Sequence, residues 1–249
     1  MTNQVADKPP TGKGRDTANW APSVDHLSAV GVEGAKVDSV TGKRVSGPLQ
    51  GFGQLWQRTY KVPLTGADLT PQQLIAAWKG EFSTFWPKSA TFYAPLAGIA
   101  PGEVALFDVA PMPGSPVKLS TGVMVLYADD ESFTFMTPEG HTISAWITFS
   151  AHRDGDVTIV QAQALERAAD PLDELIYVLT SKLMDRFWRE TLTNLARHVG
   201  VAEPMVDTQV VCIDKRRQWR YVRNLRNSAS IRTARRTLSA PFRRLTGRG

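Results

Sequence analysis

The sequence predicts an α+β fold in which a curved antiparallel sheet is covered by one long C-terminal helix. The first observation is that short apolar runs alternate with polar breaks over residues 103–167. One break contains Asp154-Gly155, a pair typical of tight hairpins, so consecutive strands are expected to be antiparallel neighbours. The second observation is that residues 170–199 repeat apolar side chains at helical spacing, over about eight turns.

The folded part is expected to begin with a strand at residues 52–62, which is rich in aromatic and branched side chains. A helix follows, because Thr70 can cap it, Pro71 fits its first position and Gln73 completes a capping box. Short hairpins then connect further strands, expected at residues 104–109, 118–127, 133–137, 142–152 and 157–166.

Asp170 is expected to cap the long helix, with Pro171 in its first turn and Gly200 just past its end. An apolar stripe would face the sheet, formed by Leu172, Leu175, Ile176, Leu179, Leu183, Phe187, Leu192, Leu195 and Val199. Such a helix is roughly 45 Å long and needs a large apolar partner. This length argues against a closed eight-stranded barrel.

The composition is that of one soluble domain with tails. The chain has 249 residues, 42% of them hydrophobic, and one cysteine, Cys212, which excludes a disulfide framework and a cysteine-based metal cluster. No histidine–carboxylate spacing indicates a metal site, and we expect no cofactor. Since no signal sequence or membrane-spanning stretch is recognisable, the protein is expected to be cytoplasmic.

Composition and charge divide the chain into three parts. Residues 1–48, rich in Gly, Pro and polar side chains, predict a flexible arm, residues 49–202 a folded domain, and residues 203–249 a basic extension. From Asp214 onward there are twelve Lys or Arg and one Asp, a net charge of +11, whereas the rest of the chain carries −6. This asymmetry indicates that the tail meets a polyanion.

Three motifs resemble an uncharacterised bacterial branch of the helix-grip (SRPBCC) superfamily, which includes START-type lipid-transfer domains, plant Bet v-like allergens and polyketide cyclases. They are the stretch from Phe133 to His141, the Asp154-Gly155-Asp156 turn, and the helix entry at residues 168–171. The order of elements over about residues 50–200 is also similar to that superfamily. One departure is that uncharged residues follow the Gly-His turn, where that branch has acidic ones. The resemblance implies a helix-grip fold with a cavity, and no particular reaction.

A cavity between sheet and helix would bind or carry a hydrophobic or amphipathic small molecule. Its candidate lining consists of aromatic residues, two strand glutamines and two helix leucines: Trp78, Phe82, Trp86, Trp146, Gln161, Gln163, Leu179 and Leu183. The aromatic residues could instead be ordinary core residues, and the glutamines could face solvent.

A cyclase-type enzyme that uses the same cavity is the alternative. His141 would be its acid or base, because imidazole titrates near neutral pH, and a buried carboxylate could move a proton in its place. A turn histidine that makes a local hydrogen bond is the simpler role, so we expect binding rather than catalysis. No Gly-x-Ser-x-Gly elbow or nucleotide loop is present.

The basic tail interleaves apolar residues with arginine over residues 211–226, as in a helix that lies on an anionic membrane. The candidate contact residues are Arg216, Arg217, Trp219, Arg220, Arg223 and Arg226. Such contacts would make a cytoplasmic protein peripheral to the membrane. Nucleic acid is the second partner class, since arginine binds phosphates and aromatic rings stack on bases, and a solvated extension is the third reading.

Overall fold

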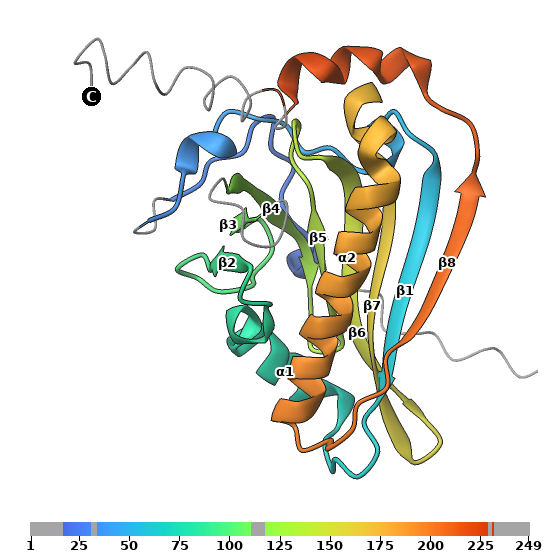
Figure 1. Ribbon diagram of the computed structural model, residues 1–249. Coiled ribbons are helices and arrows are strands. Elements are labelled where there is room, and N and C mark those ends of the chain that lie inside the picture. Colours follow the sequence, from blue (N-terminus) through green and yellow to red (C-terminus); the bar gives the residue numbers. More distant parts are fainter. Residues whose placement is uncertain (1–16, 31–33, 111–117, 229–230, 232–249) are drawn as a thin grey trace, which may run out of the picture.

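The computed structural model describes residues 17–30, 34–110, 118–228 and 231. One antiparallel sheet has the strand order β2-β3-β4-β5-β6-β7-β1-β8, and the long helix α2 lies across its concave face (Figure 1). This arrangement is the helix-grip fold that the sequence predicts. The strands are β1 (Leu55–Pro63), β2 (Ala90–Tyr93), β3 (Val104–Val109), β4 (Leu119–Ala128), β5 (Ser132–Met136), β6 (Ile143–Asp154), β7 (Val157–Ala168) and β8 (Asp207–Asp214). The α-helices are α1 (Pro71–Gly80) and α2 (Pro171–His198), and the 3-10 helices are η1 (Thr17–Asn19), η2 (Val37–Ser39), η3 (Pro48–Gln50), η4 (Phe82–Phe85) and η5 (Trp219–Asn227).

Strand pairing defines the face of the sheet that α2 covers. Tyr60 on β1 pairs with Ala162 on β7, which pairs with Phe149 on β6, and Phe149 pairs with Phe133 on β5. Paired residues share a face of the sheet and alternate residues change face. All four of these side chains are fully buried, so the concave face forms the main core.

Both α-helices begin where the sequence predicts. Thr70 accepts a hydrogen bond from the backbone N–H of Gln73, and the Gln73 side chain accepts one from the backbone N–H of Thr70, which confirms the capping box. The Asp170 carboxylate accepts hydrogen bonds from the N–H groups of Leu172 and Asp173. Both caps satisfy N–H groups that have no partner inside the helix.

The described part of the N-terminal arm packs on the convex face of the sheet. Leu27 and Val40 are buried there against β3 and β4, and the Trp20 ring lies 4.7 Å from that of Tyr127. The flexible arm that we expected is therefore corrected over residues 17–30 and 34–48. Its few apolar residues are sufficient, because the convex side of β3 and β4 presents an apolar surface to them.

The basic extension also differs from the expected amphipathic helix. Its first part is the edge strand β8, which pairs along β1, and only then does η5 follow. Val210, Val211 and Ile213 explain this difference, because branched side chains favour strands and lower helix propensity. Most of the remaining extension, residues 229–230 and 232–249, lies outside the described residues.

Candidate functional site

Aromatic side chains fill the space between α1, η4 and the C-terminal half of α2. The Phe82 ring centroid lies 5.0 Å from that of Phe92 and 5.3 Å from that of Phe149, both in edge-to-face geometry. Trp78 lies 5.0 Å from Phe149, and Trp86 packs at the border of the same cluster. Three of the candidate ligand-binding residues, Trp78, Phe82 and Trp86, are thus together in a packed aromatic cluster.

Three other candidates lie on the opposite face of the sheet. Gln163 donates a hydrogen bond to the Thr59 hydroxyl at 3.1 Å, and both alternate with the residues that face α2. Gln161 shares this face with Gln163, and Trp146 pairs with the convex-side Leu165. Their side chains therefore point away from the space beneath the helix.

The N-terminal half of α2 has its polar side turned inward. Asp173, Tyr177 and Ser181 are buried, whereas Leu175 and Leu179 are 81% and 58% exposed. The apolar stripe that we expected against the sheet is therefore wrong for this half, although it holds for the C-terminal half, where the buried apolar residues are Trp188, Leu192 and Leu195. Leu183 lies between the two halves and is partly buried. The last two lining candidates, Leu179 and Leu183, thus do not join the aromatic cluster.

Two residues on the polar side of α2 and three residues of the sheet form a group that we call the ionic cluster. Arg58 on β1 donates to Glu166 on β7 through Nε at 3.0 Å and to Asp185 on α2 through Nη1 at 2.8 Å. The Tyr177 hydroxyl donates to Glu166 at 2.6 Å, and the Tyr60 hydroxyl donates to Asp185 at 2.5 Å. Beside the cluster, the Tyr177 ring packs against Ile143, Ala145 and Ala168 of the sheet.

The charges within the ionic cluster do not balance, because two carboxylates share one guanidinium. Burial raises the pKa of Glu166; the hydrogen bond from Tyr177 and the charge of Arg58 oppose this only in part, and Asp185 adds to the rise. Burial also raises the pKa of Tyr177, with the charge of Glu166 and the hydrogen bond to it adding to the rise. The Glu166 Oε2 atom is buried and has no hydrogen-bond partner among the described residues. A buried carboxyl in this state can accept a hydrogen bond or hold a proton.

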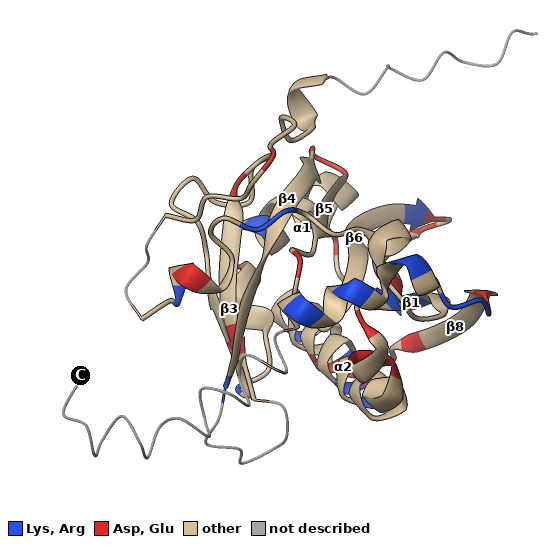
Figure 2. Ribbon diagram, turned by 90° about the horizontal axis from the view of Figure 1, so that it is seen from above, with Lys and Arg blue, Asp and Glu red and all other residues tan. Residues whose placement is uncertain are grey.

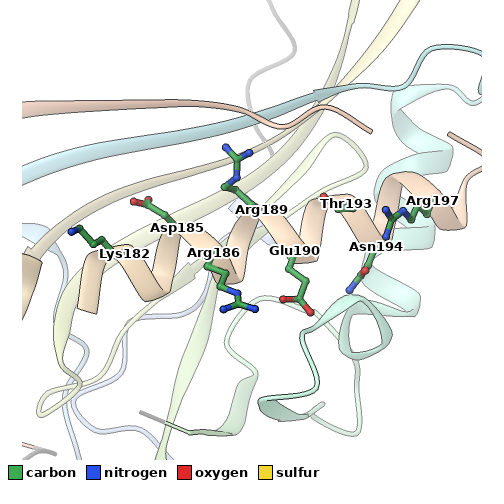
Figure 3. Close-up of a pocket in the computed structure, with 8 residues that line it drawn as sticks. All are labelled: Lys182, Asp185, Arg186, Arg189, Glu190, Thr193, Asn194 and Arg197. Carbon is green, nitrogen blue, oxygen red and sulfur yellow. The ribbon is translucent and has the colours of Figure 1, made fainter. Parts of the chain in front are cut away.

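A groove of about 660 Å³ runs along the outer side of α2 (Figure 3). Its lining is polar and mainly basic, formed by Lys182, Asp185, Arg186, Arg189, Glu190, Thr193, Asn194 and Arg197. Arg189 reaches toward β8, where it donates to Thr208, and Asn194 reaches η4, where it donates to the Phe85 carbonyl. Asp185 belongs both to this groove and to the ionic cluster, so it connects the buried charges with solvent.

His141 is a buried turn residue. Its Nδ1 atom accepts a hydrogen bond from the backbone N–H of Ile143, and its ring lies 6.0 Å from that of Phe107. Burial lowers its pKa to about 4; the Ile143 contact opposes this shift and Lys43 adds to it. Within the described ranges, no group of three or more His, Cys, Asp or Glu is placed to hold a metal ion.

Three of the six tail candidates make a contact within the described chain, although all three remain exposed. Arg216 pairs with Asp214 at 3.0 Å, Arg217 pairs with Glu174 of α2 at 2.9 Å, and Trp219 packs edge-on against Phe52. Three further tail candidates, Arg220, Arg223 and Arg226, are exposed on η5. No described helix is long and apolar enough to cross a membrane.

None of the residues predicted from the sequence belongs to the ionic cluster, although the sequence contains a signal for it. Arg58 occupies a strand position that shares its face with Tyr60 and Val62, where an apolar residue is the norm. Glu166 occupies the matching position next to Ala164 and Ala162 on β7. A charged residue on the buried face of each of two strands is the pattern that indicates such an ionic cluster.

Comparisons with known proteins give a likeness to solved structures only. No family model and no curated protein matches the chain. A solution structure named KanY protein is 15% identical, covers 60% of this chain and 99% of its own, and has a TM-score of 0.46. A START superfamily protein from Mycobacterium smegmatis is 15% identical, with coverages of 59% and 99% and a TM-score of 0.41. Major latex-like protein 151 from Panax ginseng is 11% identical, with coverages of 60% and 100% and a TM-score of 0.38. Identities and scores this low say nothing of ligand or activity.

Proposed function

We propose that this helix-grip protein binds a hydrophobic or amphipathic small molecule between α2 and the sheet, with the polar group of the ligand at the ionic cluster. The observation that carries the proposal is the unpartnered oxygen of buried Glu166, beside Arg58 and Tyr177. A buried acceptor without a partner is costly, so a ligand that donates a hydrogen bond to it would gain affinity.

The two halves of α2 suggest where such a ligand enters. The C-terminal half is anchored by apolar packing around Trp188 and Leu192, and its displacement would expose the aromatic cluster. The N-terminal half is held by hydrogen bonds from Tyr177 and to Asp185, together with a smaller apolar contact of the Tyr177 ring. A ligand can take over these hydrogen bonds but cannot replace the packing of Trp188 and Leu192, so the N-terminal half is the one that can move aside at lower cost.

The same carboxyl supports a second candidate, an enzyme of cyclase type. Burial raises the pKa of Glu166, as the general acid of such an enzyme requires. A bell-shaped or sigmoidal pH profile of turnover that disappears in Glu166→Gln would favour catalysis over binding alone. The corresponding profile for His141→Asn should be unchanged, because His141 lies outside the ionic cluster.

A finer part of the proposal is that the basic tail tethers the protein to an anionic membrane. Support comes from η5, on which Arg220, Arg223 and Arg226 are exposed and form no ion pair with any described residue. Arginine at an anionic lipid surface contributes about 1 kcal/mol per residue near the membrane. The tether would bring the ligand site close to a lipid source.

Native mass spectrometry of the full chain from its own host, followed by denaturing extraction, tests ligand binding. We expect a co-purifying amphipathic molecule, and a loss of its affinity of roughly ten- to a hundredfold in Glu166→Gln, which still accepts from Tyr177 but has lost its charge. Tyr177→Phe should act in the same direction. Gln163→Ala is the matched control, because Gln163 lies on β7 but on the convex face.

Two results would contradict the proposal. One is a protein that carries no small molecule and binds none from a lipid extract of the host. The other is a ligand whose affinity is equal in wild type, Glu166→Gln and Tyr177→Phe, which would place it away from the ionic cluster.

A further inference from the structure

The outward face of the N-terminal half of α2 is an exposed apolar surface. Leu175 is 81% exposed, Val178 70% and Leu179 58%, and Ile176 is also exposed beside them. Single exposed apolar residues are ordinary, but four within two turns of one helix form a contiguous patch. On the same side of the helix, the next positions are Lys182 and Arg186, so the apolar patch continues into a basic one.

The helix η5 has three distinct sides, because residues three apart lie above one another in a 3-10 helix. The first side, Tyr221 and Asn224, faces the protein, and Asn224 donates to the carbonyls of Gln50 and Ala169. The other two sides are exposed: Trp219, Val222 and Leu225 form an apolar row, and Arg220, Arg223 and Arg226 form a basic row.

An ion pair connects the two segments that carry these surfaces. Arg217, just before η5, donates to Glu174 of α2 at 2.9 Å, and Glu174 immediately precedes Leu175 and lies one turn from Val178. The N-terminal end of α2 and η5 are therefore neighbours (Figure 1). Seen from above, basic residues follow η5 beside that end of α2 (Figure 2).

We propose that Leu175, Val178 and Leu179, together with the two exposed rows of η5, form one docking surface for an anionic phospholipid bilayer. This inference rests on the proposed function in one respect, the membrane tether, and adds α2 itself to the contact. The apolar residues enter the interface between headgroups and acyl chains, while the arginines bind lipid phosphates. Docking places the N-terminal half of α2 on the lipid, where an amphipathic ligand can pass between the bilayer and the ionic cluster.

Charge selects a bilayer over a second copy of the chain as the occupant. A twofold dimer through this face would place two sets of η5 arginines near one another, and the described part of the patch offers no free carboxylate to neutralise them, since Glu174 already pairs with Arg217. An anionic lipid surface supplies negative charge across the whole patch.

Co-sedimentation of the full chain with vesicles tests the surface, using pure phosphatidylcholine and a mixture with phosphatidylglycerol. We expect binding to the mixed vesicles, and a decrease of about tenfold or more in the partition coefficient for Leu175→Glu/Leu179→Glu. Leu96→Glu is the control and should stay within about twofold of wild type, because Leu96 is 86% exposed in the loop between β2 and β3 and belongs to neither surface. Arg220→Gln/Arg223→Gln/Arg226→Gln should bind about tenfold or more weakly and lose most of the salt dependence.

Equal binding of Leu175→Glu/Leu179→Glu and wild type would overturn the inference, while the membrane tether through η5 would stand. Stronger binding to RNA or duplex DNA than to the vesicles would overturn both. A wild-type dimer in light scattering that becomes monomeric in the leucine variant would assign the face to a second copy. Binding of the extracted ligand from solution, without vesicles, keeps the ligand question separate, since the ionic cluster is intact in Leu175→Glu/Leu179→Glu and its affinity should equal that of wild type.

Discussion

Two buried titratable residues, Glu166 and His141, have opposite surroundings and opposite consequences. Glu166 lies among charges and has an unpartnered oxygen, so it is equipped to interact with something that is not part of the chain. His141 is buried with its acceptor nitrogen already used by Ile143. At the scale of single residues, Glu166 carries the proposed site, and His141 belongs to the turn that connects β5 and β6.

The burial of His141 makes stability depend on pH. Its pKa falls from 6.5 to about 4 in the folded chain, so between these values the unfolded chain binds a proton that the folded chain does not. Stability from this residue is complete above pH 6.5 and decreases as the pH falls toward 4. We expect a loss of roughly 2 kcal/mol between about pH 7 and about pH 5, absent in His141→Asn. Urea unfolding at both values measures it, and an identical pH dependence in both proteins would refute it.

At the scale of elements, the two halves of helix α2 have different surroundings. The half around Trp188, Leu192 and Leu195 belongs to the core, and the half from Pro171 to about residue 185 turns polar groups inward and leucines outward. The N-terminal half has less apolar packing than the C-terminal half. The stability of its first turn therefore depends more on the helix cap.

Removal of the Asp170 cap should loosen α2 from its beginning. Asp170→Ala leaves the N–H groups of Leu172 and Asp173 without their acceptor, and we expect a loss of about 1–2 kcal/mol in the free energy of unfolding. Hydrogen exchange should accelerate over residues 171–185 and remain slow over residues 188–198, which are packed in the aromatic cluster. Asp170→Ser, which can still cap, serves as the control. Uniform acceleration along α2 would show that the two halves open together.

At the scale of the whole molecule, the segments before and after residues 49–202 complete one face and one edge of the sheet. Residues from the arm cover the convex side of β3 and β4, and β8 extends the sheet beyond β1. Arg167, buried in the sheet, donates to the Gly53 and Arg216 carbonyls and to the Asp214 carboxylate, and so ties the C-terminal segment to the fold. The described parts of both segments are therefore structural parts of the domain.

If the arm is structural, a core substitution within it should destabilise the whole protein. Leu27→Ala is expected to lower the free energy of unfolding by about 2–5 kcal/mol, since Leu27 is buried against the convex side. Val30→Ala should change it by less than about 0.5 kcal/mol, because Val30 is exposed. Denaturant unfolding compares the two, and equal small effects would mean that the arm is not part of the cooperative unit.

The sequence predicts most of the fold because the signals for the fold are local. A few adjacent residues are enough to predict the helix caps at Thr70 and Asp170 and the turn at Asp154-Gly155. The ionic cluster has no local signature, since contacts from Arg58 reach across 108 and 127 residues of sequence. For the same reason, the helical pattern wrongly predicts that Leu175 and Leu179 of α2 face the sheet. Helical period shows which residues share a side, but only the charges on β1 and β7 decide which side faces the sheet.

The position of β1 between β7 and β8 affects how the protein is made. β1 is among the first strands to leave the ribosome, yet both of its neighbours are synthesised after almost all other strands. During synthesis its Tyr60 and Val62 side chains have no partner strand beside them, so a nascent chain exposes an apolar strand for most of its translation. Long-range pairing of this kind slows folding, and the growing chain is most prone to misassembly before residue 214 has been added.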